Sequence, residues 1–364
     1  MLYLGIDQHK RQLTVNLRGE DGMVILARQV STQWEKVRAF FADLADKARP
    51  EGGFFAILEV CGMNPWLLEM LVEYGCRESV VIQPTERSRQ KTDRRDASEL
   101  AHLLWVHRHH FLDGEHPQGL RRIQPPMAQE ADDRQLTALR ARLTKKHTAV
   151  INGLRKILRK HNLEHAQPTK GFQTQKVRCW LEKMELPFVD RLEVNFLLSQ
   201  WDLLDEQLKV VEAKIAERAE GNEEVKLLET VPGLGHYSAV AIRSRIGDID
   251  RFKRPDSLAN FLGLTPGCRN SGEATQRLGS ITKRGSKMVR WLLGQAVVKV
   301  LRFDGVMRGW YKRIKKKRGS KIARVAVMRR LACILWHMLK KKQRYRYDPP
   351  IKKHQEFVAY EGAA

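Results

Sequence analysis

The stretch that decides the fold of the first part of the chain is LYLGIDQHK, residues 2–10. Its apolar start is typical of a buried strand, and this strand runs directly into an acid, Asp7. A carboxylate at the end of a buried strand is costly in free energy unless it is paired or binds a cation. Asp7 is therefore the first candidate for a functional residue.

Outward from this strand, the pattern alternates between strands and helices. β-rich runs at 12–17 and 24–30 follow, so the chain opens with three strands. Apolar residues at helical spacing then alternate with further apolar strands, which is the order of an α/β fold. Residues 1–125 are thus predicted to form one α/β domain. We expect helices over 32–48, 65–74 and 96–105, and strands over 54–60 and 79–83.

Four acids in this domain have the chemistry of a metal site. Glu59 lies near the end of the strand in FFAILEVCG. Asp93 and Asp96 stand three apart in KTDRRDA, which places them on one face of a helix or of its first turn. With Asp7 they offer four hard oxygen ligands, a set that suits two Mg²⁺ ions in phosphoryl transfer. Taken singly, each acid could equally be an exposed strand end or a helix cap.

Two other folds begin in a similar way. Sugar-kinase and actin-like ATPases follow the acid of the first strand with a glycine-rich phosphate turn, whereas Gln8-His9-Lys10 follows here. The DEDD exonucleases place Asp and Glu two residues apart on that strand, but position 9 is His. An RNase H-like domain of the RuvC type is the prediction that remains.

Residues 126–225 have the pattern of long helices. Apolar residues over 197–215 repeat in steps of four and three, which is a heptad seam. A second seam covers 136–157, with Lys146 or His147 in a vacant slot. A helical hairpin, an intermolecular coiled coil or an ordinary two-helix layer would each explain the pattern, and we expect a coiled-coil region that dimerises the chain. The downstream seam consists of Leu197, Trp201, Leu204, Leu208, Val211 and Ile215.

Residues 226–345 are predicted to form a mostly helical domain with a helix-hairpin-helix around VPGLGH, residues 231–236. Gly233 and Gly235 would expose backbone N–H groups to a phosphate, aided by the positive N-terminus of the second helix. A simple turn between two helices is the alternative, and the basic composition downstream favours DNA binding. Residues 346–364 are predicted to be a poorly ordered tail.

Three serines in this region are candidate nucleophiles. A serine that attacks a phosphodiester must be exposed and close to cations, which favours Ser271 in its loop before Gly272. Ser286 opens a helix and is better explained as an N-cap, and Ser280 is predicted to be a strand or turn residue. The cations that would contact DNA beside the nucleophile are Arg269, Lys283 and Arg284.

The composition indicates a folded chain with an anionic partner. The 364 residues are 42% apolar and carry 66 Lys or Arg against 42 Asp or Glu, a net charge of +24 that points to nucleic acid. Residues 302–353 alone hold 19 Lys or Arg and two acids, within an apolar helical pattern that predicts a basic surface. Five scattered cysteines without a CxxC pair argue against zinc and disulfides. We expect no signal peptide and no membrane span, hence a cytoplasmic protein associated with the bacterial nucleoid.

Taken together, these motifs resemble the DEDD transposases of the IS110 family of insertion sequences, which are related to the Piv-type DNA invertases. The resemblance covers nearly the whole chain. It rests on GIDQHK (5–10), ILEVCG (57–62), KTDRRDASELA (91–101), ETVPGLGHYSAVAIRSRIGDIDRF (229–252), LANFLGLTPG (258–267), SG (271–272), GSITKRGSKMVRWLL (279–293) and KIARVAVMRRLACILWHML (321–339).

The resemblance implies a RuvC-like domain that carries the four carboxylates and a transposase domain with a nucleophilic serine at Ser271. It further implies guidance by a structured bridge RNA from the non-coding end of the element. The coiled-coil segment would then dimerise the chain within a tetramer, a dimer of dimers, whose active site combines carboxylates and serine from different protomers.

We therefore predict a DNA transposase in which Mg²⁺ activates a phosphodiester, Ser271 forms a phosphoserine and a DNA hydroxyl reseals the strand. One rival is a hydrolytic RuvC-like junction resolvase that uses metal-bound water. Another is a non-catalytic nucleic-acid scaffold whose acids only cap helices, which the buried acids disfavour. The recombinase and the nuclease differ in one feature: the recombinase requires a serine nucleophile, whereas the nuclease does not.

Overall fold

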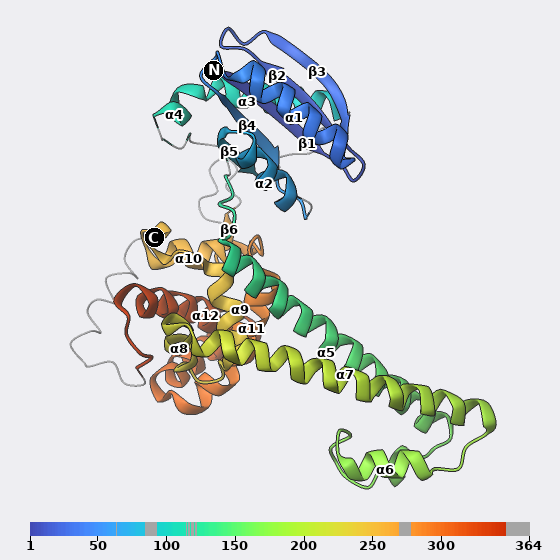
Figure 1. The fold of residues 1–364 in the computed structure, drawn as a ribbon. Helices are drawn as coiled ribbons and strands as arrows, with labels where there is room; N and C mark the ends of the chain where they lie inside the picture. The colour runs from blue at the N-terminus through green and yellow to red at the C-terminus, as the bar shows by residue number, and fades with distance from the viewer. Residues whose placement is uncertain are drawn as a thin grey trace. The chain divides into compact units, whose positions relative to one another are not determined.

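A computed structural model of the chain describes residues 1–62, 64–83, 93–113, 115, 117, 120, 122–268 and 278–346, apart from the side chains of Asp93, Cys268 and Leu278 (Figure 1). The chain divides into two compact units, Met1–Pro125 and Pro126–Ala364. The first is a mixed α/β unit and the second is mostly helical, which confirms the predicted combination of classes.

The first unit is built on a five-stranded sheet with the order β3-β2-β1-β4-β5. The first three strands are antiparallel neighbours, whereas β1, β4 and β5 are parallel. All five predicted strands are confirmed, although β5 begins three residues earlier than expected. Their bounds are β1 Leu2–Gln8, β2 Gln12–Arg18, β3 Val24–Ser31, β4 Phe54–Glu59 and β5 Cys76–Ile82.

Helices cover both faces of this sheet. The face that carries Leu4 and Ile6 packs against α1 (Trp34–Ala48) and α2 (Pro65–Glu73). The opposite face, with Tyr3 and Ile57, packs against α3 (Asp93–Val106) and the short α4 (Arg108–Leu112). The alternation of residues along β1 between the two cores is what a strand buried on both faces requires.

Helix α3 crosses β1 at a glycine. A Cβ atom on Gly5 would lie 2.3 Å from the carbonyl oxygen of Ala97 and 2.4 Å from the nitrogen of Ala101, both backbone atoms. Such distances are far inside van der Waals contact, so no residue with a side chain fits there without moving the helix. Gly5 therefore sets how closely α3 approaches the sheet.

The second unit begins with a long helical hairpin. Helices α5 (Ala128–Lys160) and α7 (Phe188–Glu220) lie side by side (Figure 1), and α6 (Gln175–Lys183) lies between them in the sequence. Four residues of the predicted seam of α7 are buried inside this chain, and Leu197 and Leu208 are partly buried. Trp201 is stacked on Phe172 and lies edge-on to His147. His147 occupies the vacant slot of the upstream seam. Of the explanations left open, pairing within the chain is the one observed.

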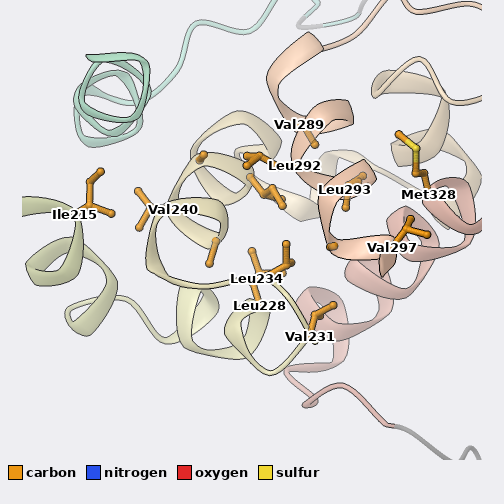
Figure 2. Packing of buried hydrophobic residues seen from close by; sticks show 14 of the residues in the cluster. Ile215, Leu228, Val231, Leu234, Val240, Val289, Leu292, Leu293, Val297 and Met328 are labelled. Atoms are coloured by element: carbon orange, nitrogen blue, oxygen red, sulfur yellow. The ribbon is translucent and has the colours of Figure 1, made fainter. Parts of the chain in front are cut away.

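One hydrophobic core joins the rest of this unit to the hairpin. It extends from Leu143 to Tyr345, and Figure 2 shows Ile215 of α7 in the same cluster as Leu292 and Met328. The division into a coiled-coil region, a C-terminal domain and a tail stays a prediction.

The remaining elements are α8 Glu223–Glu229, α9 His236–Ile246, α10 Pro255–Phe261, β6 Pro266–Cys268, β7 Leu278–Ile281, α11 Lys287–Phe303 and α12 Gly305–Lys341, with single 3₁₀ turns at Glu164–Ala166 and Ile249–Arg251. Within the described residues, no helix is long and apolar enough to cross a membrane.

The contact at Gly5 yields a stability prediction. Gly5→Ala should lower the free energy of unfolding of the first unit by about 1–3 kcal/mol or more, because the added methyl meets backbone atoms that cannot rotate away. Urea unfolding followed by circular dichroism measures it. Gly62→Ala is the matched control, since a Cβ there meets nothing within 4 Å. Equal stability of the two variants would contradict the close approach of α3.

Candidate functional site

Two of the predicted carboxylates stand side by side at one edge of the sheet. Ile6 of β1 pairs with Leu58 of β4 in parallel register, so the next residues along these strands are Asp7 and Glu59. Gly5 and Ile57, which precede Asp7 and Glu59 by two residues, both face α3. Since side chains alternate between the two faces of a strand, Asp7 and Glu59 project toward the same face. The carboxyl ends of adjacent parallel strands therefore bring these acids to the same edge and the same face.

The first turn of α3 lies at this edge too. The other end of the helix is fixed by Trp105, whose Nε1 donates to the carbonyl of Glu20 at 3.0 Å, in the turn that follows β2. That turn is close to the start of β1, since Tyr3 pairs with Arg18. Helix α3 thus runs antiparallel to β1. Asp93 and Asp96, which precede the Ala97 contact with Gly5, lie toward the end of β1 that carries Asp7.

The grouping of the four carboxylates stays a prediction. The backbone places Asp7, Glu59 and the start of α3, which contains Asp96, toward one edge of the sheet, and the side chain of Asp93 lies outside the described residues. Among the side chains that are described, no three Asp, Glu, His or Cys are close enough together to hold a metal ion. The donor set nonetheless fits a hard divalent cation, because it consists of carboxylate oxygens from rigid elements.

Asp7 is the most enclosed of these acids. Its residue is 9% exposed, and its Oδ2 lies 2.9 Å from Nε2 of His9. His9 entered the sequence analysis only as evidence against an exonuclease motif. It lies just after the end of β1, and its contact with Oδ2 places its ring beside the Asp7 carboxylate.

Asn64 ties the two strand ends together, and sequence reasoning missed it. Its Nδ2 donates to Oε1 of Gln8 at 2.9 Å and to the carbonyl of Glu59 at 3.2 Å, while its Oδ1 accepts from the backbone N–H of Cys61. Asn64 occupies the N-cap position of α2 but makes no capping bond with its side chain. An Asn before Pro65 signals a helix start, which conceals its second role.

Residues 231–235 of the predicted helix-hairpin-helix connect two helices, α8 and α9, as either a hairpin motif or a simple turn would. Gly233 has φ +89°, and a Cβ there would lie 2.9 Å from Cβ of Lys299 on α11, so this glycine serves packing. Gly235 is the N-cap of α9, and a Cβ there would meet nothing within 4 Å. Of the two glycines, Gly235 is the one whose surroundings leave room for a phosphate. Their DNA contact stays a prediction.

Arginines of α9 are structural. Nη1 of Arg245 donates to Oγ1 of Thr137 at 3.0 Å, and Nε of Arg134 donates to the carbonyl of Ser244 at 2.7 Å. Burial, and then the neighbouring guanidinium of Arg134, lowers the pKa of Arg245. These cations hold α9 against α5 and are engaged within the fold.

A small β-hairpin lies in the part of the sequence that contains the serine candidates. Strands β6 and β7 are antiparallel, with Pro266 opposite Ile281, and the segment between them, 269–277, lies outside the described residues. Ser271 and Arg269 belong to that segment, so their geometry is untested. Ser280 lies on β7, and Ser286 caps α11 by accepting from the N–H of Val289 at 3.3 Å. Both assignments confirm the sequence analysis.

The base of this hairpin is held by close backbone packing. Gly263 has φ +70°, and a Cβ there would lie 2.7 Å from the nitrogen of Arg284. Lys283 also has a positive φ, 56°, and its N–H donates to the carbonyl of Gly263. Lys283 and Arg284 thus lie just after β7, the strand that follows the segment of Ser271 in the sequence.

Helix α12 carries the predicted basic surface. It contains no acid, and it breaks at Gly319, where φ is +83°. Residues 315–322 around this break are exposed on every side. Seven exposed cations near the break form no ion pair with any described residue: Lys312, Arg313, Lys315, Lys316, Lys317, Arg318 and Lys321. Later in the helix, Arg329 pairs with Asp256 and Lys340 pairs with Asp250.

Two family models match separate parts of the chain, and the first extends past Pro125 into α5 of the second unit. A family model for DEDD transposases of the IS110 type, described as "Transposase", matches residues 4–163. A second, described as "Transposase IS116/IS110/IS902 family", matches residues 225–312. The first range includes the four carboxylates and the second includes the hairpin glycines and Ser271.

Curated relatives match over most of the chain. The "Transposase for insertion sequence element IS1111A" of Coxiella burnetii is 28% identical over 301 residues, which are 80% of this chain and 79% of that protein. A "Probable family 20 transposase" of Pseudomonas aeruginosa is 24% identical over 350 residues, 94% of this chain and 98% of that protein.

Proposed function

Because this chain belongs to the IS110 family of DEDD transposases, and so is an enzyme that acts on DNA, we propose that it cuts and rejoins element and target DNA through a serine–phosphate intermediate. The observation that supports the proposal is the position of Asp7, Glu59 and the first turn of α3 at one edge of the five-stranded sheet, where a RuvC-like domain would hold its carboxylates. Hydrolysis by a junction resolvase is the competing outcome of the tests below.

The carboxylates are proposed to bind divalent cations, two Mg²⁺ ions, as members of DEDD families use such metals. Asp7, Glu59, Asp93 and Asp96 would hold them, and the ions would neutralise charge that develops on the phosphodiester. Asn64 keeps the ends of β1 and β4 in register, so it limits the freedom of both strand acids.

Ser271 is proposed as the nucleophile. Its Oγ would form a bond to phosphorus while the bond from phosphorus to one deoxyribose oxygen breaks; the serine proton leaves and the departing oxygen gains one. A DNA hydroxyl then attacks the phosphoserine and restores Oγ–H, so no external energy is needed. Arg269, Lys283 and Arg284 would stabilise the phosphoryl charge, and Gly235 would contact the DNA backbone.

The metal proposal is tested with isosteric amides. Asp7→Asn and Glu59→Gln should each abolish strand cleavage in Mg²⁺ while DNA binding changes less than about twofold, because the lost charge serves the cation and not the DNA backbone. Cleavage assays and gel-shift titrations on the purified variants measure both. Glu51→Gln, an exposed acid of the same unit, is the control. Normal cleavage by either site variant would refute the metal site.

The nucleophile is tested by trapping the covalent intermediate. The unmutated protein should form a DNA adduct that survives SDS and disappears with protease, and Ser271→Ala should remove it. Ser286→Ala should keep the adduct and cost about 1 kcal/mol of stability, since it loses the cap of α11. DNA cutting without any adduct would favour the resolvase, whereas loss of the adduct only in Ser280→Ala would move the chemistry to Ser280.

A structured bridge RNA is proposed as a second partner, supported by the resemblance and by the unpaired cations of α12. Seven exposed cations around one helix break suit a phosphate backbone, and they would bind it without reading bases. Base pairing by a guide would then supply the choice of target.

The protein expressed with the non-coding flank of its element should copurify with one discrete RNA. Changing Lys315, Lys316 and Lys317 to Gln should reduce the slope of log affinity against log salt by about 2. A control with the same charge change is Lys47, Lys214 and Lys226 to Gln, whose ammonium groups already pair with acids. Recombination by an RNA-free preparation would contradict a guide.

Assembly into a dimer of dimers is proposed to use a second face of α7. Its seam toward α5 is occupied within the chain, but exposed apolar residues recur at heptad positions on another face. A second copy of the same helix offers the same stripe and can bury it symmetrically. The stripe consists of Val189, Leu192, Phe196, Leu203 and Val210.

Leu203→Asp with Val210→Asp should therefore halve the mass measured by light scattering and leave the helix content unchanged, since these residues are 55% and 65% exposed. Val72→Asp with Val298→Asp makes the same change at exposed apolar positions outside α7 and should leave the mass as it is. If the mass is insensitive to the α7 changes, the stripe is not the interface.

A further inference from the structure

The side of β2 that faces α3 is polar where an apolar surface would be expected. Residues 13, 15 and 17 of this strand belong to the core under α1 and α2, so the alternate residues Thr14, Asn16 and Arg18 face α3. Thr14 is 2% exposed and Asn16 is 5% exposed. Oγ1 of Thr14 and Oδ1 of Asn16 have no hydrogen-bond partner among the described residues.

A buried hydroxyl without a partner has a free-energy cost that a methyl group would not have. Threonine and valine have nearly the same shape, so valine at position 14 would fill the same space and prefer the same strand. A satisfied example is Thr137, which is fully buried and whose Oγ1 donates to the carbonyl of Asp133 at 2.7 Å, whereas Oγ1 of Thr282 also has no partner among the described residues. The hydroxyl of Thr14 therefore points to a partner that is bound only in a functional state.

The place of Thr14 identifies that partner. In the antiparallel register of β1 and β2, Thr14 stands directly opposite Asp7, so both side chains project from the same face of the sheet. Cross-strand partners have Cβ atoms about 4.5–5.5 Å apart, within reach of a hydroxyl and a carboxylate. Asp7 makes its contact at 2.9 Å with His9 instead.

We propose that Thr14 is a positioning residue of the carboxylate site: its hydroxyl donates a hydrogen bond to the Asp7 carboxylate when that carboxylate binds a divalent cation. The inference rests on the proposed metal site and adds a residue to it. Ligating carboxylates are commonly oriented by a hydrogen bond from a residue behind them, and loss of such a bond weakens metal binding about 10–100-fold. Thr14 acts on the cation only through Asp7.

Thr14→Val removes the hydroxyl and keeps the shape, and Thr14→Ser keeps the hydroxyl. Binding of Mn²⁺ alone to the full chain, followed by loss of the free-ion EPR signal, gives the dissociation constant without reference to activity. We expect Thr14→Val to raise this constant about tenfold and Thr14→Ser to leave it nearly unchanged. In EDTA the melting temperature of Thr14→Val should be equal to that of the unmutated protein or higher, because an unsatisfied hydroxyl is removed.

Thr137→Val is the matched control, since it deletes an equally buried hydroxyl that already has a partner. It should lower the melting temperature in EDTA and leave Mn²⁺ binding intact. The proposal is overturned if Thr14→Val binds Mn²⁺ normally, or if it melts lower in EDTA, which would assign the hydroxyl to a structural water. Asp7→Asn distinguishes failure of the metal site from failure of the Thr14 proposal. Normal Mn²⁺ binding in Asp7→Asn refutes the carboxylate site. Lost binding in Asp7→Asn, together with normal binding in Thr14→Val, refutes only the role of Thr14.

Discussion

The candidate site depends on the contact between Gly5 and the backbone of α3. Because no side chain separates them, the helix lies directly on β1, and the acids at its start are held at the edge where β1 and β4 end. A residue with a Cβ at position 5 would force the helix away from the sheet. The carboxylates of helix and sheet would then separate, even if each element stayed folded.

The same close approach explains the polar residues under the helix. Where α3 covers β4, the interface is apolar, as a buried layer normally is. Where it covers β2, Thr14, Asn16 and Arg18 replace that apolar surface, and Arg18 reaches Ser98 of α3 through a hydrogen bond of 3.2 Å. Polar groups in such a place lower stability unless they serve a ligand or a network, which is why we place their function at the neighbouring Asp7.

Sequence patterns predicted the five strands and the three longer helices of this unit, because each of them has a local apolar pattern; the short α4 was not predicted. The three-residue spacing of Asp93 and Asp96 also predicted from the sequence that both lie on one face of a helix or of its first turn. The structure agrees, because α3 begins at Asp93. Thr14 and Asn64 could not be found in this way. The proposed role of Thr14 follows from its position opposite Asp7 on the neighbouring strand, and that of Asn64 from its hydrogen bonds to Gln8 and Glu59 on two strands. Both roles depend on which elements become neighbours in the fold, and the sequence pattern does not give this. The heptad seam of α7 shows the same limit: its period predicted a helical partner, and only the fold identifies α5 as that partner.

The residues with the proposed chemistry are divided between two units with separate cores. The carboxylates belong to the first, at the edge of a sheet, and Ser271 belongs to the second, in the sequence between β6 and β7. The residues that follow β7 are fixed, since Gly263 packs against the backbone of Arg284 and Ser286 is engaged as a cap. In the proposed mechanism, such a division would make strand exchange conditional on assembly, because a serine alone is a poor nucleophile and needs the cations that the carboxylates would bind. A DNA-cutting enzyme built in this way would form its phosphoserine only after both parts had reached the same phosphodiester.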